Sequence, residues 1–102
     1  MIKEKYCLYV HTNLINNKKY VGVTKREPRK RWENGHGYYS NKEFYNDILK
    51  YGWDNFTHEI LLENLSKDEA SEMEKKYIKE YSSNKKKYGY NHTTGGLDYI
   101  PK

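Results

Sequence analysis

The sequence predicts a small α+β domain: a three-stranded antiparallel sheet, made of an N-terminal hairpin and a third strand, flanked by about three helices. Two observations carry this prediction. Two β-branched and aromatic runs flank an asparagine-rich turn near the N-terminus, and an amphipathic helix follows a third such run. A chain of 102 residues is long enough for one core and too short for two, so we expect a single domain over 1–102.

The composition favours a folded chain over a disordered one. Hydrophobic residues make up only 35% of the sequence, but aromatic residues reach 16% and include twelve tyrosines. Because each aromatic ring buries a large area, a chain of this kind can build a core from few residues. We therefore expect a small, tyrosine-rich core.

The hairpin is expected to consist of strands at 6–12 and 19–24, joined by a turn at 13–18. Pairing Tyr9 with Tyr20 sets the register. Side-chain alternation then divides the hairpin into an aliphatic face (Leu8, Val10, Val21 and Val23) and a second face (Cys7, Tyr9, Tyr20 and Gly22). We expect the aliphatic face to meet the core and the tyrosines to lie on a more polar face.

Two helices and a strand are expected next. A short helix is predicted at 28–35, with Pro28 in its first turn. A second helix is predicted at 41–51, with Ser40 as a possible N-cap and Gly52 as its stop. The sequence NFTHEILLEN, at 55–64, is typical of a strand.

The last helix, predicted at 66–83, contains a carboxylate in an unexpected place. It opens with a capping box formed by Ser66 and Glu69. Its apolar stripe consists of Ala70, Met73, Tyr77, Ile78 and Tyr81. Glu74 lies inside this stripe, where an unpaired carboxylate costs several kcal/mol. Two interpretations are open: a partner within the fold, such as a basic group or a tyrosine hydroxyl, or a hard divalent cation such as Mg²⁺.

The charge distribution points to a polyanionic partner. The net charge is +5, and seven basic residues lie between positions 18 and 31 against one acid, Glu27. A concentrated basic segment favours nucleic acid, although a solvated lysine-rich surface is the alternative. The candidate nucleic-acid-binding residues are Lys18, Lys19, Lys25, Arg26, Arg29 and Lys30.

Several other classes of protein are disfavoured. The single cysteine, Cys7, excludes an intramolecular disulfide, and the spacing of Cys and His matches no structural zinc site. The N-terminus lacks the apolar core of a signal peptide, and no stretch is long and apolar enough to span a membrane. We expect a cytoplasmic protein without a membrane partner, either a monomer or a homodimer.

Six motifs in order make the sequence resemble the GIY-YIG nuclease superfamily, as a minimal single-domain member. The two name-giving strand motifs read Cys7-Leu8-Tyr9 and Tyr20-Val21-Gly22. The others are KRW (30–32), KYGWDNF (50–56), EKKYIKEY (74–81) and GYNHTTGG (89–96). Each motif is weak alone, but together, in the right order, they cover nearly the whole chain.

The resemblance implies a set of site residues. Tyr9, Tyr20, Arg31 and Glu74 fall on the catalytic positions of the family, and Asn91 falls on a supporting asparagine. The sequence departs from the family twice. Cys7 replaces the first glycine of the name, and Gly35 stands where several members carry a histidine, with His36 next to it as a candidate substitute. His11, His58 and His92 are taken as surface or structural groups.

The resemblance also implies an activity: metal-dependent hydrolysis of phosphodiester bonds in DNA, by a motif tyrosine and a metal-activated water in an in-line attack. Mg²⁺, or Mn²⁺ as its substitute, would be held by Glu74, and Arg31 would stabilise charge on the phosphate. Gly22 would let the substrate approach the strand. RNA is a second possible substrate. Two other functions stay open: a catalytically silent nucleic-acid-binding module of the same fold, and a protein-interaction domain with a tyrosine-rich surface.

Overall fold

The computed structural model describes residues 5–93 and residue 95. Its elements are β1 (Tyr6–Asn13), β2 (Lys19–Thr24), α1 (Pro28–Trp32), the 3-10 segment η1 (Glu33–Tyr38), α2 (Lys42–Tyr51), the 3-10 turn η2 (Trp53–Asn55), β3 (Phe56–Leu65) and α3 (Lys67–Tyr81). The three strands form one antiparallel sheet in the order β2-β1-β3. The predicted α+β fold and order of elements are therefore confirmed.

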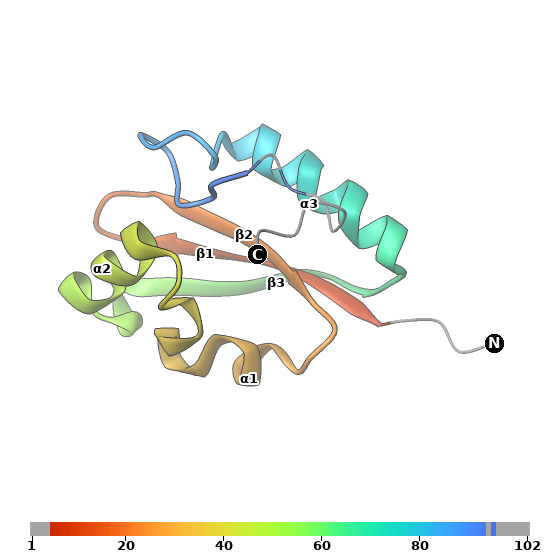
Figure 1. Cartoon of the computed structure of the whole chain (residues 1–102), viewed down its shortest axis with the longest axis horizontal. Helices are drawn as coiled ribbons and strands as arrows, with labels where there is room; N and C mark the ends of the chain where they lie inside the picture. Colours follow the sequence, from red (N-terminus) through yellow and green to blue (C-terminus); the bar gives the residue numbers. More distant parts are fainter. Residues whose placement is uncertain (1–4, 94, 96–102) are drawn as a thin grey trace.

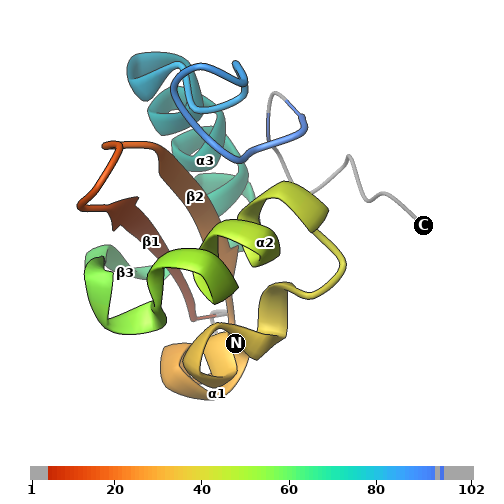
Figure 2. The ribbon, with the colours of Figure 1, turned by 90° about the vertical axis from the view of Figure 1, so that its left-hand side faces the viewer.

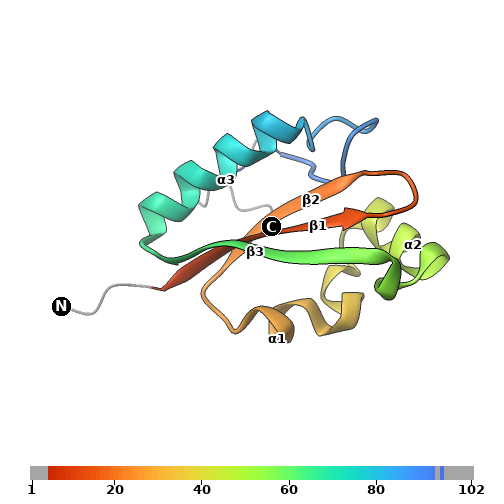
Figure 3. The same cartoon turned by 180° about the vertical axis from the view of Figure 1, so that it is seen from behind.

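The sheet lies between two helical layers. α3 runs along one face, and α1 and α2 cover the other (Figure 1). Turning the molecule by 90° shows both layers with the sheet between them (Figure 2), and the view from behind shows α3 above the sheet and α1 below it (Figure 3). Within the described part of the chain, no helix is both long and apolar enough to cross a membrane.

The face of the sheet under α3 is aliphatic, as predicted. Leu8, Val10 and Val21 are buried there against Ile78 of α3. Val23, Met73, Tyr77 and Tyr81 pack around this cluster. The 3.6-residue period of α3 and the alternation of the two hairpin strands thus meet in one core.

The tyrosine face of the sheet is also a core, and the expectation of a polar face was wrong. Its buried residues are Cys7, Tyr9, Trp32, Tyr38, Phe44, Ile48, Phe56 and Tyr90. Most of these rings come from the segments that follow the hairpin, which fold back over β1 and β2. The tyrosine-rich core expected from the composition lies here, and Tyr9 is only 1% exposed.

The hairpin register differs from the predicted one by two residues. Tyr9 lies opposite Gly22, and Tyr20 lies opposite His11. The reason is the structure of the loop at 14–18: Asn13 Oδ1 accepts from the backbone N–H of Ile15, and Asn16 Oδ1 accepts from that of Lys18. A shift of two residues preserves side-chain alternation, so each residue still lies on its predicted face.

The helix ends follow the local sequence with two differences. α2 is capped by Asn41 rather than Ser40, because the Asn41 side chain accepts from the backbone N–H of Phe44. α1 ends at Trp32, since Glu33 adopts a left-handed conformation and the chain continues as η1. Gly52 ends α2 with a φ of 90°, and the predicted capping box of Ser66 is present.

The segment after α3 returns to β2, which is the edge strand next to β1. The backbone N–H of Lys19 donates to Tyr88 O over 3.1 Å, and that of Tyr90 donates to Lys19 O over 2.9 Å. Asn91 continues this contact beside Val21. Residues 88–91 thus lie along the β2 edge, beside the second name-giving strand motif.

Candidate active site

Tyr9 lies across β2 because Gly22 leaves room for its ring. A Cβ atom on Gly22 would stand 2.5 Å from the Tyr9 hydroxyl oxygen and 2.6 Å from the ring carbon that carries it. The space that the sequence suggested for a substrate is therefore filled by the phenol of Tyr9. The absence of a side chain at Gly22 thus lets Tyr9 of β1 lie over β2.

Substituting Gly22 by alanine should displace Tyr9. We expect Gly22→Ala to destabilise the fold by about 1–3 kcal/mol, the usual cost of overpacking a core. Thermal unfolding measures this effect. The double variant Tyr9→Ala with Gly22→Ala is the control, because without the ring the added methyl group should cost nothing further. Additive losses in the double variant would contradict the contact.

Tyr38 joins Tyr9, Tyr20 and Arg31 into one cluster. Its hydroxyl oxygen lies 3.2 Å from that of Tyr9, and its ring centroid lies 5.0 Å from that of Tyr20. The Arg31 guanidinium lies over the Tyr38 ring at 4.7 Å and donates to the carbonyl of Gly37 over 2.8 Å. The structure thus brings three of the predicted residues together around a tyrosine that sequence reasoning missed.

Burial raises the pKa of all three phenols. It is the largest effect on the pKa of Tyr9, of Tyr20 and of Tyr38, and the Arg31 guanidinium acts in the opposite direction on each. Since an unperturbed phenol has a pKa of about 10, all three hydroxyls are protonated at neutral pH.

Glu74 acts on the same phenols from the other layer of the molecule. It lies half-buried on α3, which packs on the aliphatic face of the sheet. Its negative charge nevertheless adds to the rise in the pKa of both Tyr9 and Tyr20, after the effect of burial. Tyr9, Tyr20 and Arg31 therefore belong to the cluster on one face of the sheet, and Glu74 lies on the helix that packs on the other face.

The Glu74 carboxylate is the kind of ligand that a hard divalent cation prefers. The described residues hold no group of three or more His, Cys, Asp or Glu side chains that could bind a metal. Mg²⁺ does not need such a group, because it commonly binds one or two carboxylates and completes its shell with water and phosphate oxygens. A single carboxylate whose charge acts on Tyr9 and Tyr20 suits a cation that binds together with a phosphate.

Asn91 is bound to the backbone of β2. Its side-chain amide donates to Val21 O over 2.8 Å and accepts from the backbone N–H of Val21 over 2.9 Å. The Ser83 hydroxyl donates to the same Asn91 oxygen. Asn91 thus holds the residue between Tyr20 and Gly22 in place. Positions 94 and 96 of the predicted 89–96 motif lie outside the described residues.

His36 contacts Tyr45 of α2. It is exposed, and its Nδ1 lies 3.0 Å from the hydroxyl oxygen of Tyr45. Gly35, at the position where several family members carry a histidine, has a φ of 96°. A Cβ there would stand 2.7 Å from a methyl carbon of Ile48. The backbone at this position is therefore shaped for glycine.

The predicted nucleic-acid-binding residues lie at the two ends of β2. Lys25, Arg26, Arg29 and Lys30 are exposed at its C-terminal end and on α1. At the other end, Lys18 Nζ lies 5.8 Å from the centre of the Tyr90 ring. Lys19 Nζ donates to the Thr12 hydroxyl over 2.9 Å, so its charge is held on the α3 side of the sheet.

A second basic segment, at 85–87, was missed by sequence reasoning. Its three lysines are exposed in the loop after α3, next to the start of β2. In sequence they are far from the basic residues at 18–31, and the hydrogen bond from Lys19 N–H to Tyr88 O connects the two. Basic residues therefore flank the site on both sides.

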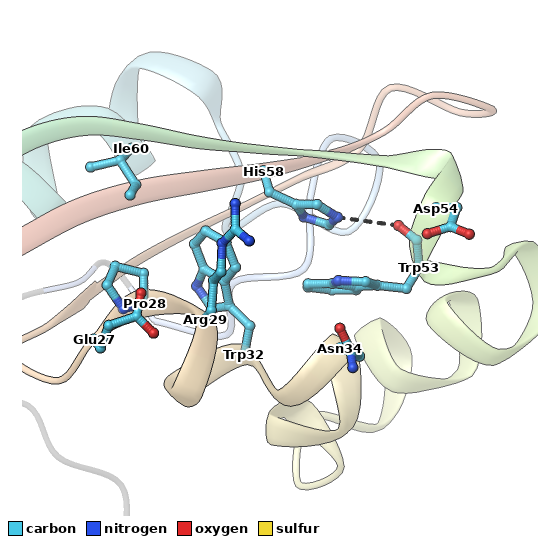
Figure 4. Close-up of a pocket in the computed structure, with 9 residues that line it drawn as sticks. All are labelled: Glu27, Pro28, Arg29, Trp32, Asn34, Trp53, Asp54, His58 and Ile60. Atoms are coloured by element: carbon cyan, nitrogen blue, oxygen red, sulfur yellow. Dashed lines mark hydrogen bonds between the residues drawn. The ribbon is translucent and has the colours of Figure 1, made fainter.

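His11 and His58, which we expected to be surface or structural groups, lie at the aromatic core. His11 is fully buried, and His58 is half-buried on the neighbouring strand. His58 stacks on Trp53 with 4.0 Å between ring centroids, at a cavity of about 460 Å³ (Figure 4). The cavity lies between α1, η2 and β3, and its lining includes Glu27, Arg29 and Asp54.

The sequence was compared with known proteins and families. A family model described as the GIY-YIG catalytic domain matches residues 5–88. Comparisons with curated proteins and with solved structures gave no significant match. The family match covers most of the 102 residues, including both strand motifs, α1 and α3. The chain therefore belongs to the GIY-YIG family, whose catalytic domain has a nuclease-type fold.

Proposed function

We propose that this protein is an endonuclease that hydrolyses phosphodiester bonds of DNA with the help of a divalent cation, Mg²⁺ or Mn²⁺. One observation carries the proposal: the Tyr9 hydroxyl, the Tyr20 ring and the Arg31 guanidinium all contact Tyr38 in one cluster. The negative charge of Glu74 also raises the pKa of Tyr9 and of Tyr20. A cation clamp, a carboxylate and proton-transfer groups are the parts that phosphodiester hydrolysis needs.

Arg31 would bind the phosphate and stabilise the charge that develops on it. Its position over Tyr38 and its hydrogen bond to Gly37 O fix the guanidinium before substrate arrives. A preorganised donor of this kind lowers the barrier because it need not reorient during the reaction.

Glu74 would hold the divalent cation, which supplies charge neutralisation at the phosphate oxygens when it is bound. Tyr9 and Tyr20 would orient the attacking water and take part in removing its proton. Asn91 would keep β2 in register with the site through its two hydrogen bonds to Val21. The basic residues on both sides would hold the nucleic-acid backbone.

The test is cleavage of supercoiled plasmid by the purified protein. We expect nicking or cutting with Mg²⁺ or Mn²⁺ and none in EDTA. The proposed reaction needs a cation beside the phosphate, and EDTA removes it. Gel electrophoresis of plasmid, of linear duplex and of RNA, each with and without chelator, measures the activity and the preferred substrate. Cleavage that continues undiminished in EDTA would rule out the metal role.

The alternative is a nucleic-acid-binding module that does no chemistry. It is less well supported, because Tyr9, Tyr20, Arg31 and Glu74 are all present. Salt-sensitive binding of plasmid without cleavage in either metal would favour it.

A further inference from the structure

A chain of polar side chains leads from Tyr9 through the aromatic core to the cavity beside β3. The Tyr9 hydroxyl oxygen lies 3.2 Å from that of Tyr38, which lies 2.8 Å from His11 Nε2. His11 Nδ1 lies 2.9 Å from His58 Nδ1, and His58 Nε2 lies 3.2 Å from the carbonyl oxygen of Trp53. Figure 4 shows the last of these contacts at the cavity. The four contacts form one unbroken path.

The carbonyl at the end of the path sets the direction of every hydrogen bond. A carbonyl oxygen only accepts, so His58 Nε2 carries a proton. If both histidines are neutral, His58 Nδ1 accepts from His11 Nδ1–H, and His11 Nε2 accepts from the Tyr38 hydroxyl. Tyr38 has one proton, so in this arrangement Tyr9 donates to Tyr38. The Tyr9 oxygen then donates to Tyr38 and keeps its own lone pairs as acceptors. The reverse direction, from the Tyr38 hydroxyl to the Tyr9 oxygen, belongs to the arrangement in which His58 is protonated.

Both histidines are neutral at pH 7. Burial, followed by the nearby His58, lowers the pKa of His11 well below its usual range. Burial also lowers the pKa of His58, against the opposing effects of the Trp53 carbonyl and of Asp54. The neutral arrangement is therefore the resting one.

A second, fully paired arrangement exists with one more proton. If His58 is an imidazolium, Nε2–H still donates to Trp53 O, and Nδ1–H donates to His11 Nδ1. His11 Nε2–H then donates to Tyr38, Tyr38 donates to Tyr9, and the Tyr9 proton points towards the site. Every buried polar atom of the path keeps a partner in both arrangements, which is the condition for a stable buried network.

We propose that His11, Tyr38 and His58 are positioning residues that act through Tyr9, and that the path carries the proton of the attacking water from Tyr9 to His58. This inference rests on the proposed function.

In this step the water oxygen bonds to phosphorus and its proton passes to the Tyr9 oxygen. The Tyr9 proton moves to Tyr38, the Tyr38 proton to His11 Nε2, and the His11 Nδ1 proton to His58 Nδ1. The phosphorus–oxygen bond breaks, and its electron pair stays on the leaving sugar oxygen, which takes a proton from solvent. The resting arrangement is restored when the shifts reverse: His58 returns its Nδ1 proton to His11, His11 returns its Nε2 proton to Tyr38, Tyr38 returns its proton to Tyr9, and Tyr9 releases one proton to solvent at the site.

The path resolves a difficulty of tyrosine chemistry in a buried site. Because burial raises the pKa of Tyr9, a free phenolate is not available at neutral pH. A neutral Tyr9 can still accept a proton if it passes its own proton on at the same time. The base is then a neutral histidine, the side chain most often used for general base catalysis.

The first test is independent of catalysis. Nitrogen-15 NMR of the histidine-labelled protein at pH 7 should show His11 protonated on Nδ1 and His58 protonated on Nε2. The opposite tautomers would overturn the proposed path, whether or not the protein cleaves DNA. A wild-type protein with these tautomers but no cleavage would instead contradict the proposed function.

The second test is chemical rescue. His58→Ala should reduce plasmid cleavage by at least ~10²-fold, the scale of a lost proton transfer, with unchanged binding of DNA in metal-free buffer. Added imidazole should restore cleavage, since the cavity of about 460 Å³ opens beside this position. Pyrazole, which has a similar shape but is a far weaker base, is the control and should not restore it.

An undiminished rate in His58→Ala, or an equal response to imidazole and pyrazole, would overturn the proposal and indicate a packing role. If His58→Ala does not fold, His58→Gln replaces it, because the amide can both donate and accept but cannot take up a proton. The path predicts the same loss of cleavage in His58→Gln with a melting temperature close to that of the wild type. A wild-type rate in that variant would overturn it.

Discussion

Glu74→Ala should abolish DNA cleavage while leaving DNA binding intact. Removing the carboxylate removes the proposed cation site, and a cation at the phosphate is worth several kcal/mol, or at least ~10³-fold in rate. Removing a negative charge beside the site should hold or improve the affinity for DNA in metal-free buffer. Plasmid cleavage and metal-free binding curves, measured on the same preparation, separate the two effects.

The matched control is Glu72→Ala on the same helix. Glu72 is exposed and lies 3.9 Å from Lys75, so its loss changes the net charge by the same amount away from the site. The Glu72→Ala variant should cut DNA at close to the wild-type rate. If Glu74→Ala unfolds the protein, Glu74 is a structural partner within the fold and its assignment as a metal ligand should be withdrawn.

Tyr9→Phe and Tyr20→Phe should each lower cleavage by at least ~10²-fold with little change in the fold. Phenylalanine keeps the ring and removes the hydroxyl, so the aromatic core around Tyr38 and Phe44 is preserved. Single-turnover rates at saturating metal measure the effect, and thermal melts check the fold.

The control for these two variants is Tyr39→Phe, because Tyr39 is 75% exposed and follows directly after Tyr38. It should cut at the wild-type rate. Wild-type rates in both Tyr9→Phe and Tyr20→Phe would show that these tyrosines only pack, and the proton-transfer role would be lost.

Sequence patterns predicted most of the fold because they act over short distances. Alternation in the hairpin and the 3.6-residue period of α3 depend only on near neighbours, and both were confirmed. The hairpin register was wrong because it depends on a loop in which Asn13 and Asn16 bind the backbone. Even so, an error of two residues leaves every side chain on its correct face.

The candidate site was only partly accessible to sequence reasoning. Glu74 stood out because it interrupts an apolar stripe, whereas Tyr38 lies in a segment without a periodic pattern. The pairing of His11 with His58 depends on the register of β1 with β3, which changes at irregularities between Tyr6 and Tyr9. No spacing along the chain encodes such a contact, so the polar path behind Tyr9 emerges only in three dimensions.

The return of the C-terminal segment to β2 has a consequence for the newly made chain. Tyr88, Tyr90 and Asn91 occupy the outward N–H and C=O groups of Lys19 and Val21, and 70 residues separate Val21 from Asn91. At roughly 5–20 residues per second, the ribosome needs several seconds to synthesise these residues. During this interval the hairpin presents an open strand edge, to which another unfinished chain can add. The β2 edge is therefore covered only after residues 88–91 have been synthesised.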